Sequence, residues 1–325
     1  MDDNENNIEQ EKLIENSDNN LSSQKDNYTP CSNSQDIEIY ISNARFRLRS
    51  KKPSPKNQLI DLSEGKEKTI IYFPLNCKPK LLRTNFDYKL NYITKSFINN
   101  GNIDEYSLTK DYSCSCEYDC SDENCDCLVN HVQRYECNEN CSCDNTNCKN
   151  RVVQKGISKK LKVDFISKSK GFGVFCMEQI SKDEFVCEYI GQIISKQQAE
   201  DKLHFNLMKK KANYVLQIRE NYEKMIINTF IDAENKGNVS RFLNHSCDPN
   251  LYFDIIRINH FIPQVAFFAM RDIEVGEELT FSYMESKINS SFDKDKIIIE
   301  ENQDMSNSYK LCLCGAENCN KFLPS

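Results

Sequence analysis

Nine cysteines lie between residues 114 and 148, and this cluster limits what the chain can fold into more than any other feature. Its two halves have related spacings, C-x-C-x3-C-x4-C-x-C and then C-x3-C-x-C-x4-C. Only His131 lies among them, which excludes a Cys2His2 zinc finger. An odd number of thiols also fits poorly with a closed set of disulfides. The cluster comprises Cys114, Cys116, Cys120, Cys125, Cys127, Cys137, Cys141, Cys143 and Cys148.

Coordination arithmetic favours a zinc–thiolate cluster for these nine residues. Three tetrahedral zinc ions present twelve ligand positions. Nine thiolates fill them if three of the sulfurs each bridge two metals. Such a triangular cluster would carry roughly three net negative charges, which nearby backbone N–H groups could help to offset. Because structural zinc supplies folding free energy, we expect this region to unfold without metal.

A second cysteine set lies near the C-terminus, where LCLCGAENCNKF spaces three thiols as C-x-C-x4-C. Three thiolates leave one tetrahedral zinc position open. Cys247, in the polar stretch RFLNHSCDPN, is the best candidate for the fourth ligand. We therefore expect a fourth zinc ion to join the C-terminal segment to that stretch. The three C-terminal thiols are Cys312, Cys314 and Cys319.

The remaining composition indicates a soluble chain that suits a basic partner. Residues 1–35 are rich in Asn, Ser, Asp and Glu, which predicts disorder. No apolar run is long enough to span a membrane and no signal-peptide core is seen, so we expect a protein that is not secreted. The net charge of −7 argues against broad DNA binding. The basic stretch 45–56 is either a nuclear-import signal or a solvated strand and turn.

Between the two cysteine sets the pattern is that of a β-rich domain with one clear helix. Ser195 followed by Gln198 predicts a capping box that begins a helix over 195–208. No P-loop, Rossmann fingerprint, HExxH or GxSxG motif is present. KGFGV allows close backbone approach to a ligand, but by itself is more typical of a hairpin turn. Apolar alternation and β-branched residues predict strands over 160–167, 185–194, 214–218, 266–270 and 279–283.

Several motifs taken together resemble one family. KGFGV, CEYIG, RFLNHSC and ELTFSY follow the order of the SET-domain motifs. The nine-cysteine block ending CKNRVVQKG resembles a pre-SET module, and CLCGAENC resembles a post-SET module. Over residues 86–325 the chain thus resembles a SET-domain histone lysine methyltransferase. FVCEY and GNVSRFLNHSCDPNL are most similar to the heterochromatin subgroup that modifies histone H3 lysine nine, and especially to SETMAR-like sequences.

The resemblance implies a mainly β fold with few helices. This is the SET-domain pseudoknot of small curved sheets, in which RFLNHSC threads beneath ELTFSY, flanked by zinc-cluster pre-SET and post-SET modules. The implied divisions are a disordered tail (1–35), an N-terminal flank with the basic cluster (36–85), pre-SET (86–156), SET (157–285), a mobile linker (286–310) and post-SET (311–325).

The resemblance also implies S-adenosylmethionine as cofactor. Methyl transfer to a neutral amine depends on orientation and needs no nucleophilic side chain. Tyr283 matches the essential tyrosine of the family, and Tyr189 matches a second channel tyrosine. The implied cofactor-binding residues are Gly171, Phe172, Gly173, Tyr214, Arg241, Phe242, Asn244 and His245.

Phe281 occupies the position that controls how many methyl groups are added. A tyrosine there would hold a water that blocks rotation of a methylated amine, whereas phenylalanine cannot. We therefore expect di- and trimethylated product. Two residues depart from the family pattern: Ser282 replaces a common Asp, and Gln192 replaces a common Glu.

The expected function is that of a nuclear, chromosome-bound enzyme that methylates the histone H3 tail or nucleosome in chromatin silencing. Lysine nine is the favoured target, with position thirty-six as the alternative. A catalytically idle zinc-dependent chromatin scaffold is the second class of function, but it need not keep Tyr283 or Asn244. A zinc-rich nucleic-acid binder is disfavoured, because residues 111–150 hold nine Asp/Glu against two Lys/Arg. We expect no membrane contact and no strong direct DNA binding, and the targeting partner is unknown.

Overall fold

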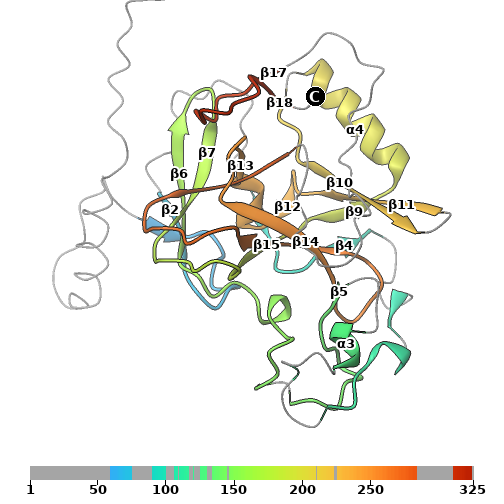
Figure 1. Ribbon diagram of the computed structural model, residues 1–325. Coiled ribbons are helices and arrows are strands. Elements are labelled where there is room, and N and C mark those ends of the chain that lie inside the picture. The colour runs from blue at the N-terminus through green and yellow to red at the C-terminus, as the bar shows by residue number, and fades with distance from the viewer. Residues whose placement is uncertain are drawn as a thin grey trace, which may run out of the picture.

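The computed structural model describes residues 59–74, 90–99, 106–108, 110–116, 120, 125–129, 134–144, 146–209, 211–222, 225–283 and 310–323. Within them the protein is built mainly from short strands in small sheets, as the resemblance implied (Figure 1). The predictions for the tail 1–35, for the basic stretch 45–56 and for most of the linker 286–310 concern residues outside these ranges.

A six-stranded mixed sheet joins segments from both ends of the domain in the order β1-β2-β6-β7-β16-β13. The β6–β7 hairpin is antiparallel, and β16 adds antiparallel to β7. At the far edge β13 lies parallel to β16. Its strands are β1 (Leu59–Asp61), β2 (Ile71–Pro74), β6 (Leu161–Ser167), β7 (Gly171–Cys176), β16 (Glu278–Phe281) and β13 (Asn244–His245).

Two four-stranded sheets form most of the remaining β-structure. The first has the order β5-β14-β15-β8, and the second has the order β10-β11-β9-β4. Their strands are β5 (Arg134–Tyr135), β14 (Leu251–Arg257), β15 (Gln264–Ala269), β8 (Phe185–Tyr189), β10 (Val215–Tyr222), β11 (Met225–Asp232), β9 (Gln192–Ile194) and β4 (Phe97–Ile98).

The remaining elements are paired two-residue strands, short helices and the longer helix α4. In Figure 1, α3 lies at one end of the molecule, and β17 and β18 lie near the other. No helix in the described ranges combines the length and apolar content that a membrane crossing requires. These elements are β3 (Asn91–Tyr92), β12 (Lys236–Gly237), β17 (Lys310–Leu311), β18 (Phe322–Leu323), α3 (Asp126–Val129), α4 (Lys196–Met208), η2 (Lys110–Tyr112), η3 (Val153–Lys155) and η4 (Val239–Phe242).

One hydrophobic core joins the sheets and reaches the segments that carry the sequence motifs. Its most buried members come from strands of all three larger sheets, and each side chain of this size contributes about 2 kcal/mol when it leaves water. Phe172, Phe242, Tyr189 and Phe281 belong to the same core. The site residues are therefore held by the packing that stabilises the fold. The central buried side chains include Leu161, Ile231, Leu251 and Phe267.

The predicted helix begins where its capping box places it. The Ser195 hydroxyl accepts a hydrogen bond from the Gln198 backbone, and the Gln198 side chain accepts one from the Ser195 backbone. The backbone N–H groups of Ser195 and Gln198 have no partner within the helix, and both are bonded by these side chains. The sequence alone therefore determines where this helix starts.

One strand prediction is wrong, because the run 185–194 is split into β8 and β9, which lie in different sheets. The break falls at Ile190 and Gly191. A Cβ on Gly191 would lie 2.4 Å from the Asp232 carbonyl oxygen, so the backbones pass too closely there for a side chain. The glycine lets the chain turn from one sheet to the next.

The RFLNHSC stretch and the ELTFSY stretch lie side by side although 30 residues separate them. Parallel pairing places Asn244 beside Thr280 and His245 beside Phe281. Asn250 adds two bonds to the same strand, from its Nδ2 to the Glu278 carbonyl and from the Thr280 N–H to its Oδ1, each 2.9 Å long. These contacts bring the two motifs into one structural unit.

Candidate active site

Asn238 anchors the beginning of the RFLNHSC stretch. It is fully buried, and its Oδ1 accepts bonds from the backbone and hydroxyl of Ser240, at 3.0 and 2.6 Å, which caps η4. Its Nδ2 donates to the Glu188 carbonyl on β8 at 2.9 Å. One side chain thus holds η4, which carries Arg241, against β8, which carries Tyr189.

Asn244 is held at the pocket by two acceptors. Its Nδ2 donates to the Phe172 carbonyl at 2.9 Å and to Oε1 of Glu278 at 2.8 Å. The other Glu278 oxygen pairs with the Lys170 ammonium at 3.0 Å. Since the amide nitrogen is fully used, the Asn244 side-chain oxygen is left free to accept a hydrogen bond from a ligand.

Gly173 is required by this arrangement. A Cβ at this position would lie 2.9 Å from the Glu278 carboxylate and 3.1 Å from Nδ2 of Asn244. It would also lie 2.5 Å from the Ile166 side chain. The second glycine of KGFGV therefore makes room for the polar side chains that support the pocket.

The surroundings of Arg241 show whether the site can hold S-adenosylmethionine. Its side chain is buried, with the guanidinium carbon 4.3 Å from the centre of the Tyr214 ring. Its Nε and Nη1 atoms are buried and have no hydrogen-bond partner among the described residues. A buried cation without acceptors is costly, and a carboxylate matches a guanidinium best. The carboxylate of the cofactor's methionine portion is such a group, so the residues fit.

Tyr283 and His245 are linked through the backbone of the ELTFSY segment. The Tyr283 hydroxyl donates to the Leu243 carbonyl at 2.9 Å, and its backbone N–H donates to Nδ1 of His245 at 3.0 Å. Because Nδ1 accepts, the proton lies on Nε2, which faces Sγ of Cys247 at 3.3 Å. Burial lowers the pKa of His245, in keeping with a neutral ring. His245 thus connects the tyrosine to a predicted zinc ligand.

Tyr189 forms the second phenol of the pocket. Its hydroxyl donates to the Tyr214 carbonyl at 2.9 Å. Burial raises the pKa of both Tyr189 and Tyr283, and each of the two phenols lies within electrostatic reach of Tyr214. Both phenols therefore keep their protons near neutral pH and act as fixed hydrogen-bond donors.

Phe281 lies next to the catalytic tyrosine candidate. Its ring centre is 4.9 Å from that of Tyr283 and 4.7 Å from that of Phe267. The side chain is buried and has no polar atom to hold a water molecule.

The pre-SET thiols meet the geometric requirement for a shared metal cluster. The structure brings eight of the nine into three overlapping groups of four sulfurs, with all sulfurs of a group within 4.8 Å of one another. Cys114 and Cys120 each belong to two groups, and Cys137 belongs to all three. Cys116 lies outside the groups. Overlap of this kind is what bridging thiolates require, so the donor set fits zinc.

Donors around the thiols can offset the excess negative charge. Sγ of Cys141 accepts from two backbone N–H groups, those of Cys114 at 3.5 Å and Asn138 at 3.2 Å. Nη2 of the buried Arg151 lies 3.6 Å from Sγ of Cys143. Arg151 follows the last cysteine closely in sequence but was not predicted to contribute, because no spacing rule indicates it.

The C-terminal thiols come together with the RFLNHSC stretch. Cys247, Cys312, Cys314 and Cys319 form one group of four with sulfurs within 4.8 Å. The backbone N–H of Asn320 also points to Sγ of Cys247, at 3.4 Å. This is the complete tetrahedral donor set that coordination arithmetic required.

A β-rich domain with two motifs threaded side by side, a phenol-lined pocket and thiol clusters on either side defines the class of SET-type protein lysine methyltransferases. Residues 171–284 match the SET domain family. The chain belongs to the SET-domain family of histone-lysine N-methyltransferases, which transfer methyl groups from S-adenosylmethionine.

Similar proteins extend the match beyond the SET domain. A probable histone-lysine N-methyltransferase of Caenorhabditis briggsae, set-23, is 40% identical over 227 residues, covering 65% of this chain and 86% of the relative. The crystal structure of the methyltransferase domain of human SETMAR is 30% identical with a TM-score of 0.67, covering 82% of this chain and 98% of that one. KRYPTONITE, solved in complex with DNA, an H3(1-15) peptide and SAH, is 26% identical with a TM-score of 0.59, covering 84% of this chain and 55% of that one.

Two residues that support the site, Glu278 and Lys170, were not predicted from the sequence. Glu278 begins the ELTFSY motif and Lys170 begins KGFGV, yet neither belongs to a recognised ligand pattern. Only their ion pair, which spans 108 positions of the chain, shows that they act together.

Proposed function

We propose that this protein methylates a lysine of the histone H3 tail and that lysine nine is its principal target. The observation that carries the proposal is the buried Arg241 side chain beside Tyr214, whose Nε and Nη1 have no hydrogen-bond partner among the described residues. It offers an anion site for the cofactor next to phenols that can guide an amine. The peptide in the KRYPTONITE complex, H3(1-15), includes position nine and excludes position thirty-six.

The residues of the pocket contribute orientation and desolvation rather than a general base. Tyr189 and Tyr283 keep their protons, because burial raises the pKa of both. The substrate ammonium, with a reference pKa of about 10.4, must therefore lose its proton to water before reaction. Burial and a nearby positive charge both lower that pKa. When bound, S-adenosylmethionine supplies the electrophilic methyl group that the amine takes from sulfur.

We further propose that product is di- and trimethylated. Phe281 packs on Tyr283 and Phe267 and offers no hydroxyl to hold a water. A methylated amine can then displace loosely held solvent and rotate for another transfer.

The thiol clusters support a content of four zinc ions. Three would lie in the pre-SET cluster, with all nine thiolates as ligands, and one would lie between Cys247 and the C-terminal thiols. Since Cys247 contacts His245, the C-terminal zinc would also steady the pocket. A nuclear, chromatin-bound location follows from a histone substrate.

The test is methylation of histone H3 peptides, read by mass spectrometry. One peptide covers residues 1–15, a second carries arginine in place of lysine nine, and a third spans lysine thirty-six. We expect methylation of the first peptide only. Methylation confined to the third would refute the lysine-nine assignment, and methylation of none, including nucleosomes, would favour the idle scaffold. Tyr283→Phe protein serves as the inactive control.

A further inference from the structure

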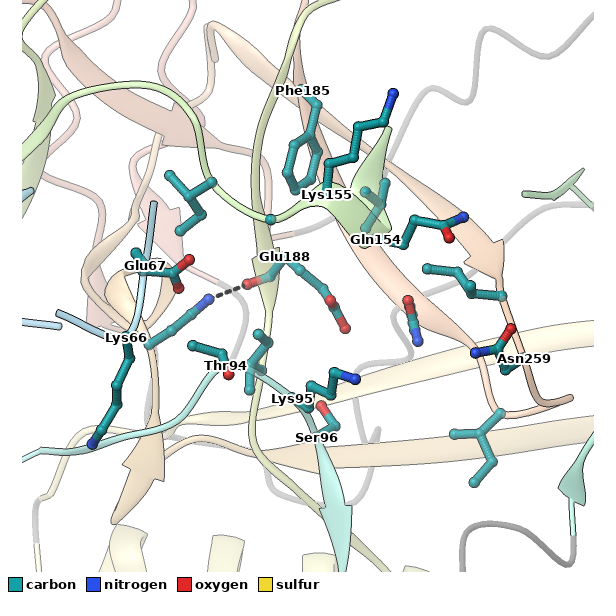
Figure 2. Close-up of a pocket in the computed structure, with 18 of the residues that line it drawn as sticks. Lys66, Glu67, Thr94, Lys95, Ser96, Gln154, Lys155, Phe185, Glu188 and Asn259 are labelled. Atoms are coloured by element: carbon teal, nitrogen blue, oxygen red, sulfur yellow. Dashed lines mark hydrogen bonds between the residues drawn. The ribbon is translucent and has the colours of Figure 1, made fainter. Parts of the chain in front are cut away.

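A cleft of about 560 Å³ lies on the opposite face of β8 from the phenol pocket (Figure 2). Tyr189 points into the pocket, and its neighbour Glu188 points to the other side, as alternate residues of a strand do. The volume falls within the range of small-ligand sites, roughly 300–1,000 Å³. None of the predicted site residues lines this cleft.

The Glu188 carboxylate projects into the cleft without a counter-ion. Figure 2 shows its side chain reaching into the space above Lys95 and Ser96. It forms no hydrogen bond or ion pair with any of the described residues. Desolvation raises the pKa of Glu188 to about 8, and the negative charges of Glu136 and Glu67 add to that effect. Near neutral pH the unliganded group is therefore largely protonated, and a ligand that donates hydrogen bonds and carries positive charge would bind its ionised form.

A second acceptor in the cleft wall is also unsatisfied. Oε1 of Gln264, at the start of β15, is buried and has no hydrogen-bond partner among the described residues. Both unmet groups are acceptors, so a ligand must bring several donors. A planar guanidinium has five N–H donors and can serve two separate acceptors at once.

The walls suit the aliphatic part of an arginine side chain. Ile190, Ile193, Ile258 and Ile262 line the cleft. Such walls can cover a methylene stem while the charged head meets polar groups.

The lysines of the cleft do not fill it. Nζ of Lys66 donates to the Tyr92 carbonyl at 2.8 Å, and Nζ of Lys155 lies 3.4 Å from the Cys148 carbonyl. Both extend away from the interior in Figure 2. Lys95 lies nearer, and its charge partly offsets that of Glu188 without forming an ion pair.

We propose that this cleft binds the guanidinium group of an arginine side chain from a basic protein segment, with Glu188 and Gln264 as its acceptors. The lining also holds four lysines, so selection of an arginine rests on the two unmet acceptors and not on overall charge. The proposal rests on the geometry of the cleft and does not depend on the methylation site.

Methyl NMR of isoleucine-labelled, zinc-loaded protein tests the proposal, because five isoleucines line the cleft. N-acetylarginine amide is the probe, and N-acetylcitrulline amide is its uncharged counterpart. The signals of Ile190, Ile193, Ile258 and Ile262 should shift saturably with the arginine probe, and citrulline should bind at least tenfold more weakly. An equal response to citrulline would overturn the proposal. So would the absence of any shift, including an absence that arises because another segment of the chain already fills the cleft.

Variants locate the binding. Glu188→Gln should weaken arginine binding at least tenfold, whereas Glu200→Gln, the same change on an exposed face of α4, should leave it unchanged. Unaltered binding by Glu188→Gln would overturn the proposal. Zinc content and thermal unfolding report whether each variant folds. If Glu188→Gln does not fold, Gln264→Met decides: a fivefold or greater loss supports the proposal, and unchanged affinity overturns it.

Discussion

Glu278 is the residue whose replacement tests the pocket most directly. In Glu278→Gln the ion pair with Lys170 is lost, and the bond from Asn244 changes from charge-assisted to neutral. The Lys170 pair is about one-fifth exposed, with side-chain values of 19% and 21%, so its loss costs about 1 kcal/mol. Replacing a charged acceptor by a neutral one costs about 1 kcal/mol more. The sum of about 2 kcal/mol is the most that reorienting Asn244 can cost on binding, so cofactor affinity should fall by up to about thirtyfold.

Calorimetry with S-adenosylhomocysteine measures this loss. The KM for S-adenosylmethionine should rise by a similar factor, while kcat should change little, because Tyr283 keeps its own contacts. Glu277→Gln is the matched control, since its carboxylate pairs with Arg271 at the surface rather than with the pocket. A dissociation constant within twofold of the wild-type value, or an equal loss in the control, would refute the role given to Glu278.

The other predictions concern catalysis, product, metal and pH. Tyr283→Phe should abolish turnover with little loss of thermal stability, since only the hydroxyl bond to the Leu243 carbonyl is removed, and a near-native rate would show that this phenol only packs. Phe281→Tyr should stop at monomethyl-lysine in a mass-spectrometric time course, and wild-type protein that stalls there with excess cofactor would contradict the reasoning. Cys312→Ser should lower zinc content from about four ions to about three by elemental analysis and remove most activity; a loss of all zinc would contradict separate sites. The rate should rise with pH towards a lysine pKa that the site lowers from its reference value of about 10.4, without a fall below pH of about 10 from the phenols, because burial raises the pKa of Tyr189 and Tyr283. A fall below that pH that Tyr189→Phe abolishes would contradict the assignment.

Local signals were enough to predict the elements whose cause is local. The capping box of Ser195 and Gln198 closes within four residues, so no distant contact is needed to start α4. The apolar alternation that predicted a strand over 160–167 matches β6. By contrast, the run 185–194 looked continuous, because the close approach of the Asp232 backbone to Gly191 has no trace in the local sequence.

The rules of zinc coordination predicted more of the metal sites than the spacing of the cysteines alone. A tetrahedral ion needs four donors, and that requirement pointed from the three C-terminal cysteines to Cys247. The structure brings all four sulfurs together. The donors that surround the thiols, such as Arg151, follow no spacing rule and became visible only in the folded chain.

The sequence by itself determined the family, the helix start and most strand positions and indicated which thiols gather, because each depends on residue type and spacing. The tertiary structure decided which distant residues share a site. Asn244 and Lys170 both contact Glu278 only after β13, β16 and β7 have assembled. Glu188 and Gln264 line the same cleft because β8 and β15 pair in another sheet. Such contacts follow from the packing of the whole core. The spacing of residues along the chain does not specify which distant residues come together on folding.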